Sequence, residues 1–511
     1  MQGMENQHET LLKIAKYFVF SCTLALVCDI PDTYSQLYFL AKASLYGILF
    51  LTLLLPNRLS LAFLLILAVV GQDIVQTNSQ RESGDLFLAS VWQGSLGPLR
   101  PSWVFMLYCI ALLTKNRSLL LEKSVSHVLL WFATIPLITA YFYGNFTTSD
   151  ALTEIPTDMK APLFLIVSIL LFGSCIKSQP SAFVDFGLAF LGAVLARHAI
   201  DFAYATLGFG AQFGDVVRVS VDSTKGTVVF LLLFSLFLIM RTRYILWGNV
   251  LALASALLLV VYATRGLWVS AILGLILFAL MMNAKKLLIA LPVIGGIGYS
   301  GLLLLSMLFP DTIELASHRL DEHAIGHADN VFERYFPTRY AEILNATDAT
   351  LSRKAILWGS GYGSYYTESA ISFPNQIDSA FAEHSIVSGQ YYTIHNFVFR
   401  TLFEYGVIGL LLLSGLWIVP GWRCYHAFQN PSTSLLGGIS IAMVAFLPTS
   451  MFEMTWTGKG MIIGGFAITF LQYAYRCSHH SSHHAKSSAI PSRPRAFARK
   501  SLSKRRLIGG I

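Results

Sequence analysis

A histidine followed by polar residues at helical spacing is the feature of this sequence best suited to acid–base chemistry. His395 precedes Asn396, and Arg400 and Glu404 continue from Asn396 at intervals of four residues. On a helix these polar side chains lie along one stripe, where Arg400 and Glu404 can pair. A neutral imidazole at the start of such a helix can take a proton from a hydroxyl group. His395 is therefore the candidate general base, with Asn396, Arg400 and Glu404 as candidate substrate-binding residues, although a single histidine is more often structural.

Arginines next to apolar runs are the second group with chemical potential. Arg265 separates the runs 245–264 and 267–282, and Arg218 lies in a polar segment ahead of the run 226–240. A guanidinium group can bind a phosphate through two parallel hydrogen bonds, so both are candidates for binding an anionic substrate. The alternative for Arg265 is a side chain that reaches from the membrane interface into water. Arg339 and Arg353, in the long segment before His395, are further candidates.

Two other polar segments have more modest interpretations. The glycines of Gly359-Ser-Gly-Tyr-Gly363 predict a tight turn whose exposed backbone N–H groups could contact an anion. This segment lacks the Lys-Ser/Thr pair of a P-loop. Arg197, His198 and Asp201 lie inside one apolar run, and the favoured interpretation is an ion pair between neighbouring helical turns.

The composition defines the elements that must position these groups. Of 511 residues, 55% are hydrophobic and only 13% are charged, and the mean hydropathy is +0.59. A soluble chain carries roughly a quarter charged residues. A membrane span needs about 20 apolar residues that satisfy their own backbone polar groups. The expected fold class is therefore all-α, a polytopic integral membrane protein. The apolar runs cover residues 14–30, 37–55, 59–75, 103–114, 125–143, 161–176, 182–207, 226–240, 245–264, 267–282, 287–309, 398–419, 435–450 and 461–475.

Charges in the turns between these runs predict the topology. If the N-terminus is cytoplasmic, every inside turn contains Lys or Arg, as the positive-inside rule requires. This predicts about 12 to 14 transmembrane helices with both termini in the cytoplasm. The first run lacks a cleavage pattern of small residues, so we expect it to remain as a helix. Transmembrane segments 1–309 and 395–475 then flank one long outside segment.

Residues 310–394 are that outside, periplasmic segment. They include eleven Asp/Glu, five Lys/Arg and seven Tyr. Such a long connection is usually functional or disordered, and its aromatic residues favour a small folded lid. Residues 476–511 are predicted to be a basic, disordered cytoplasmic tail. The nine Lys/Arg of this tail exceed the whole net charge of +8, so the basic balance indicates a tail beside anionic lipid, and no nucleic-acid partner is expected.

Signatures of several other chemistries are missing from the sequence. It contains no HExxH, acidic metal pair or GxSxG, which argues against a metalloenzyme or a serine hydrolase. The six cysteines contain no CxxC pair. Asn145 and Asn345 fit the N-glycosylation pattern, which is common by chance. We expect no metal and no cofactor.

The segment around His395 resembles the signature of the O-antigen ligase/polymerase family. In that signature a His-Asn pair opens a helix, and a Glu and two Gly follow at the spacing seen here. Gly359-Ser-Gly-Tyr-Gly363 is similar to the family's Gly-x-Gly turn, and Thr264-Arg265-Gly266 is similar to its Ser/Thr-Arg-Gly at a span boundary. The resemblance covers about residues 216–415, and its residues around the histidine are His395, Asn396, Phe399, Leu402, Glu404, Gly406 and Gly409.

The resemblance implies a GT-C-like, metal-independent glycosyltransferase of the bacterial inner membrane. The donor would be a glycan on undecaprenyl pyrophosphate, presented at the periplasmic face. The acceptor hydroxyl would belong to lipid A–core for a ligase, to another lipid-linked glycan for a polymerase, or to a protein Ser or Thr. Arginines would stabilise the leaving pyrophosphate, with Arg265 as its clamp and His395 as the base. We favour a ligase because one dominant outside segment is typical of ligases.

Two classes of protein without this activity also fit the composition. A polysaccharide transporter or flippase could use the charged turns as a path, although the inverted repeats common in transporters are not visible. A structural membrane protein would use its polar residues only at the membrane interface. Transfer by purified protein without ATP or an ion gradient separates an enzyme from both.

Overall fold

The computed structural model describes residues 2–29, 35–71, 101–115, 123–147, 149–206, 211–213, 216–218, 223–262, 265–282, 296, 333, 337–374, 383–427, 435–453 and 458–488. This part of the chain is almost entirely helical, as the apolar runs predicted. The helices of its first half are α1 (Gln2–Cys28), α2 (Ser35–Leu51), α3 (Asn57–Val70), α5 (Pro101–Lys115), α6 (Lys123–Phe142), α7 (Ser149–Ser178) and α8 (Ser181–Thr206). Those of its second half are α9 (Thr227–Arg241), α10 (Ile245–Val261), α11 (Arg265–Met282), α15 (Pro337–Ser352), α16 (Glu383–Ser388), α17 (Phe397–Ala427), α18 (Leu435–Glu453) and α19 (Gly458–Ser488).

Among the described residues, four helices are long and apolar enough to cross a membrane: Glu9–Cys28, Glu154–Ser178, Ser181–Tyr204 and Phe397–His426. Each other predicted apolar run also coincides with a helix, except the run 287–309, of which only residue 296 is described. The structure thus confirms a helical protein with several segments suited to a membrane.

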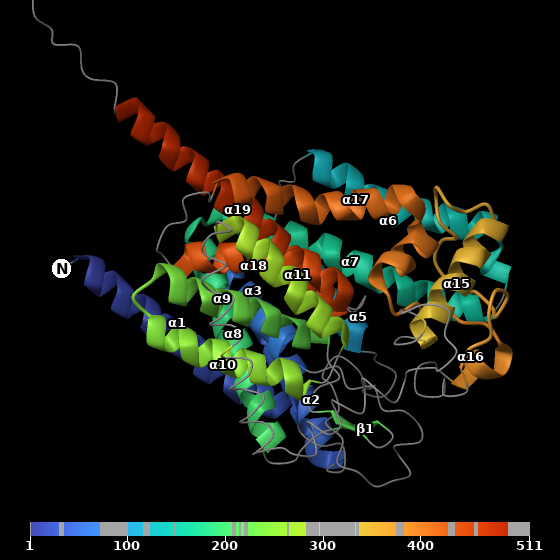
Figure 1. Cartoon of the computed structure of the whole chain (residues 1–511), viewed down its shortest axis with the longest axis horizontal. Helices are drawn as coiled ribbons and strands as arrows, with labels where there is room; N and C mark the ends of the chain where they lie inside the picture. Colours follow the sequence, from blue (N-terminus) through green and yellow to red (C-terminus); the bar gives the residue numbers. More distant parts are fainter. Residues whose placement is uncertain are drawn as a thin grey trace, which may run out of the picture.

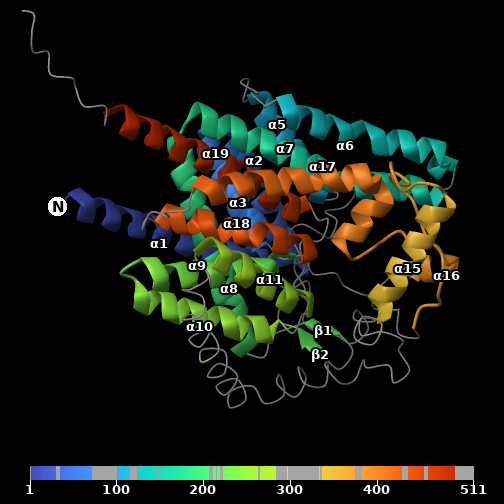
Figure 2. The same ribbon diagram turned by 45° about the horizontal axis from the view of Figure 1, so that its top comes forward.

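The two ends of the helical bundle differ. The start of α1 and the end of α19 lie at one end, whereas α15 and α16 lie at the opposite end, in both views of the ribbon (Figures 1 and 2). The N-terminus and the C-terminal helix are therefore on the same side of the bundle, and the helices of the long predicted outside segment are on the other side.

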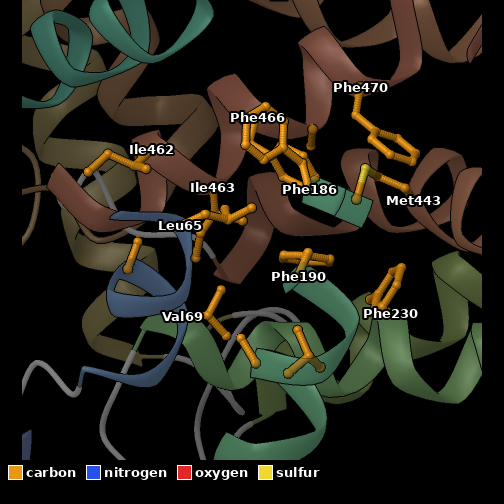
Figure 3. Packing of buried hydrophobic residues seen from close by; sticks show 14 of the residues in the cluster. Leu65, Val69, Phe186, Phe190, Phe230, Met443, Ile462, Ile463, Phe466 and Phe470 are labelled. Carbon is orange, nitrogen blue, oxygen red and sulfur yellow. The ribbon is translucent and has the colours of Figure 1, made fainter. Parts of the chain in front are cut away.

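Aromatic and branched side chains fill the centre of the bundle. Phe186 and Phe190 of α8 pack against Phe466 of α19, either directly or through Phe172 of α7, and Phe230 of α9 lies 5.0 Å from Phe190 between ring centroids (Figure 3). These rings are fully buried. Because the contacts join helices from both halves of the chain, segments before and after residue 310 share one hydrophobic core.

The described residues 337–374 and 383–394, called the lid below, have a small core of their own. Tyr366 and Tyr391 pair through reciprocal backbone hydrogen bonds of 3.1 and 2.9 Å, and their rings stack 5.7 Å apart. The buried residues of this core are Ala341, Ala346, Tyr366, Phe373, Tyr391, Ile394 and Phe403. These described residues are therefore folded around a buried cluster, and Phe403 connects this lid core to α17.

The structure differs from the expectations drawn from the sequence in two places. Strands β1 (Ala211–Phe213) and β2 (Val216–Arg218) form an antiparallel pair, with Ala211 opposite Arg218. The two residues between them in sequence are Gly and Asp, which favour hairpins. At the other end of the chain, α19 continues to Ser488, past the start of the predicted disordered tail at 476. No Gly or Pro interrupts the sequence between Cys477 and Ser488.

Candidate functional site

The site is built around a break in α17. Gly406 has φ +67° and ψ −174°, so the helix stops there and begins again at once. This backbone conformation is open essentially only to glycine. The break removes the helical donors of the Phe403 and Glu404 carbonyl groups, and it separates the N–H groups of Val407 and Ile408 from their usual acceptors.

A segment of the lid supplies the four missing partners. Ser360 N–H donates to Phe403 O (2.7 Å), and Gly361 N–H donates to Glu404 O (3.0 Å). In the opposite direction, Val407 N–H donates to Ile356 O (2.8 Å), and Ile408 N–H donates to Leu357 O (3.2 Å). These four hydrogen bonds therefore satisfy the backbone groups at the break, and they join the lid to α17.

The Gly359–Gly363 turn is tight, as its glycines predicted, but its N–H groups do not face an external anion. Gly359, Gly361 and Gly363 all have positive φ, between 70° and 81°. The N–H groups of residues 359 to 362 donate to backbone carbonyls of Ala355, α17 and Pro136, and Gly363 N–H donates to the carboxylate of Asp158 (2.8 Å). The prediction that this turn contacts an anionic ligand is therefore wrong, because the protein itself uses these donors.

The same turn is attached to α6 through a proline. Pro136 has no N–H, so the carbonyl of Phe132 lacks its helical donor. The Tyr362 hydroxyl donates to this carbonyl at 2.8 Å. Asn145 donates from Nδ2 to the carbonyls of Ser360 (3.0 Å) and Tyr362 (2.9 Å). Asn145 is buried, and its role is to hold the turn, so it is not an accessible glycosylation site.

His395 is held by a buried carboxylate of the lid. Its Nδ1 lies 2.8 Å from Glu342 Oε1, and its backbone N–H donates to Glu342 Oε2 at 3.1 Å. Glu342 also pairs with Arg339, one helical turn earlier in α15. The Glu342 side chain is 1% exposed, whereas that of His395 is 26% exposed. The imidazole is thus held by Glu342 and is partly exposed.

Opposing effects act on the pKa of Glu342. Burial acts to raise it, but His395, through its charge and its hydrogen bonds, and the charge of Arg339 together lower the pKa below its usual value of 4.5. Glu342 therefore remains an ionised hydrogen-bond acceptor at neutral pH. Nothing in the spacing of the sequence pointed to this residue, which lies 53 positions before His395.

Arg400 and Glu404 pair as the helical stripe predicted. Arg400 Nε donates to Glu404 Oε1 at 2.6 Å, and Nη2 donates to Asp158 Oδ1 of α7 at 2.8 Å. Glu404 and Asp158 are buried. Asp158 accepts from both Arg400 and the Gly363 turn, so this carboxylate connects α7, α17 and the lid. The spacing of the sequence gave no sign of this role of Asp158, which lies 242 positions before Arg400.

Asn396 has a local structural role. Its Oδ1 accepts from the N–H groups of Val398 (3.0 Å) and Phe399 (3.2 Å), which caps the start of α17. In the lid, Asn345 is fully buried and bonds to Ala370 and Ile371. This second glycosylation pattern is therefore not accessible either.

Arg353 is the lid arginine with unused hydrogen-bonding capacity. Its Nη2 donates to the Tyr365 carbonyl at 2.7 Å, and its guanidinium carbon lies 5.2 Å from the centre of the Tyr365 ring. Nη1 is buried and has no hydrogen-bond partner. Burial lowers the pKa of Arg353. A buried cationic N–H group without an acceptor is costly, and an anionic ligand would relieve that cost.

For two other predicted arginines only the backbone is described. Arg218 ends β2, and Arg265 is the first residue of α11. The structure therefore groups His395 with Arg339 and Glu342, and Arg400 with Glu404 and Asp158. It places Arg218 and Arg265 at the termini of other elements.

No protein-family model and no curated protein matches this chain. The class that the fold defines is a helical protein with several segments suited to a membrane. In this protein the lid is hydrogen-bonded to α17 at the break in that helix.

Proposed function

We propose that this chain is a polytopic glycosyltransferase of the bacterial inner membrane with about 12 to 14 spans. It would transfer a glycan from undecaprenyl pyrophosphate to an acceptor hydroxyl at the periplasmic face, and we favour lipid A–core as the acceptor. The single observation that carries this proposal is the His395–Glu342 pair, because it gives the candidate base a defined orientation at the junction of lid and helix bundle.

The pair supports general base catalysis. When Nδ1–H of the neutral imidazole donates to Glu342, the ring has its lone pair on Nε2. Nε2 would take the proton of the acceptor hydroxyl as its oxygen bonds to the anomeric carbon. The bond from that carbon to the pyrophosphate oxygen breaks at the same time. Glu342 would then stabilise the imidazolium.

The leaving pyrophosphate needs positive charge. Arg265 is proposed as its clamp, with Arg218, Arg339 and Arg353 as further contacts, because guanidinium groups bind phosphate oxygens in pairs. For Arg353, the role as a pyrophosphate contact is supported by its buried Nη1, which has no hydrogen-bond partner. Arg400 and Glu404 would act less directly, since Arg400 pairs with Glu404 within α17 and with Asp158 of α7, and so connects the two helices.

The decisive experiment uses purified protein, a lipid-linked glycan and a lipid A–core acceptor, without ATP or an ion gradient and in EDTA. We expect transfer. Its absence, with lipid-linked glycan instead moved across a vesicle membrane, would favour the transporter. Transfer that stops in EDTA and returns with magnesium would contradict a mechanism based on arginine.

The acceptor is tested in a deletion strain. Loss of all polymer from the lipopolysaccharide core, with polymer retained on the lipid carrier, indicates a ligase. A core that carries one repeat unit indicates a polymerase, and an unchanged core together with an unglycosylated protein indicates a protein glycosyltransferase.

A further inference from the structure

A buried network of charged side chains lies outside the site described above. Arg197 of α8 donates to Asp29, which follows α1, at 2.7 Å and to Asp201 at 2.5 Å. The side chains of Arg197, Asp29 and Asp201 are at most 2% exposed. This confirms the predicted ion pair between turns of one helix and extends it to Asp29, directly after α1. Because two carboxylates bind one guanidinium, these three side chains are held rigidly, and so are the groups that bond to them.

His198, next in sequence, forms a bridge on top of this network. Its Nδ1 lies 2.7 Å from the Tyr262 hydroxyl, and its Nε2 lies 2.9 Å from Thr227 Oγ1. The Tyr262 hydroxyl donates to Asp201 Oδ2 at 2.6 Å. Because that hydroxyl gives its proton to Asp201, its oxygen accepts from Nδ1–H of His198. In the neutral ring, Nε2 then accepts from Thr227.

The bridge joins two segments that carry proposed substrate-binding arginines. Thr227 is the first residue of α9, shortly after the end of β2 at Arg218. Tyr262 directly follows α10, and three residues later α11 begins at Arg265. His198, Tyr262 and Thr227 are all buried. The bridge therefore fixes the end of α10 relative to the start of α9, and His198 itself is distant from both arginines in sequence.

We propose that His198 is a positioning residue for the lipid-pyrophosphate donor. Through Tyr262 and Thr227 it fixes the start of α11 relative to the start of α9, so that Arg265 and Arg218 reach one pyrophosphate. This inference rests on the proposed function. A cation pair that is held in place before binding stabilises anionic oxygens without the cost of reorganisation.

The test removes single hydroxyl groups of the bridge. Tyr262→Phe and Thr227→Val each preserve most of the buried volume and delete one hydrogen bond to His198, and Tyr262→Phe also deletes the bond to Asp201. The matched control is Tyr108→Phe, which removes a buried hydroxyl that lies 2.6 Å from Thr52 Oγ1. Equilibrium affinity for undecaprenyl-pyrophosphate-linked glycan and the kcat and KM of transfer are measured for each folded variant.

We expect Thr227→Val to weaken donor affinity about tenfold, the factor that one buried hydrogen bond corresponds to, and Tyr262→Phe to weaken it at least as much, each with a smaller change in kcat. Tyr108→Phe should reduce thermal stability but leave donor affinity unchanged. Unchanged donor affinity in both bridge variants overturns the inference, and so does an equal loss in the control. A wild-type protein that neither binds nor transfers the glycan overturns the proposed function, and the inference falls with it.

Discussion

Gly359 and Gly406 meet backbone against backbone. A Cβ atom on Gly359 would lie against the Glu404 carbonyl, and a Cβ atom on Gly406 would lie against the carbonyl of Leu357 and the nitrogen of Gly359. Both residues also have positive φ, 75° and 67°. The lid and α17 therefore approach as closely as two backbones can, and side chains are excluded from both positions.

Gly406→Ala should destabilise the folded protein by about 2–5 kcal/mol, because it adds backbone strain and a steric clash that no side-chain movement relieves. Gly415→Ala is the matched control in the same helix, since a Cβ there meets nothing within 4 Å. Thermal unfolding in detergent measures both. Equal stability of the two variants would contradict the described break in α17.

His395→Ala should reduce transfer by about 10²–10⁴-fold without loss of donor binding, since a general base acts on the reaction step. Glu342→Gln should reduce kcat at least about tenfold, because the amide cannot stabilise the imidazolium as a carboxylate does. His426→Ala is the control, an exposed histidine near the other end of α17. Near wild-type turnover by folded His395→Ala would remove His395 from the mechanism.

The stability of the lid should fall in acid because of Glu342. Its pKa in the folded protein is below the usual value of 4.5, so the ionised form is favoured by folding. The resulting stabilisation is fully present above pH 4.5 and is lost as the pH falls through the lowered pKa. Hydrogen exchange of lid amides between pH 6 and pH 3 measures this loss, with Glu342→Gln as the reference. The same acid dependence in Glu342→Gln would exclude Glu342 as the source.

Arg265→Ala should weaken donor binding and transfer, and Arg265→Lys should restore only part of both, because an ammonium group lacks the planar fork of a guanidinium. Arg243→Ala, which removes an exposed arginine between α9 and α10, is expected to change neither. If lysine fully replaces Arg265, the residue acts as an interface cation and not as a pyrophosphate clamp.

Cysteine labelling tests the predicted orientation. Val387 in α16 is 82% exposed, and the turn between α9 and α10, which contains the exposed Arg243, lies at the opposite end of the bundle (Figures 1 and 2). In intact spheroplasts, a membrane-impermeant maleimide should modify Val387→Cys but should modify Arg243→Cys only after permeabilisation. The reverse result would place the lid in the cytoplasm and contradict the proposed periplasmic reaction.

The helices were predictable from sequence because each depends on a local run of apolar residues. The Arg400–Glu404 pair was predictable for the same reason, since helical spacing alone brings the side chains together. The partners of His395 and Arg400 were not, because Glu342 and Asp158 are distant in sequence and become neighbours only through folding. The role of the Gly359–Gly363 turn was not predicted, because its glycines indicate a tight turn but do not indicate which acceptors its backbone N–H groups bind.

The backbone hydrogen bonds between the lid and α17 also have a consequence for biogenesis. The chain is synthesised from its N-terminus, so α6 and the segment 356–361 exist before residues 403–408 emerge. The carbonyl and N–H groups of the α17 break thus meet partners that have already been made. A deletion within the segment 356–361 would leave the break without partners after translation is complete, and the expected phenotype is degradation of the full-length chain.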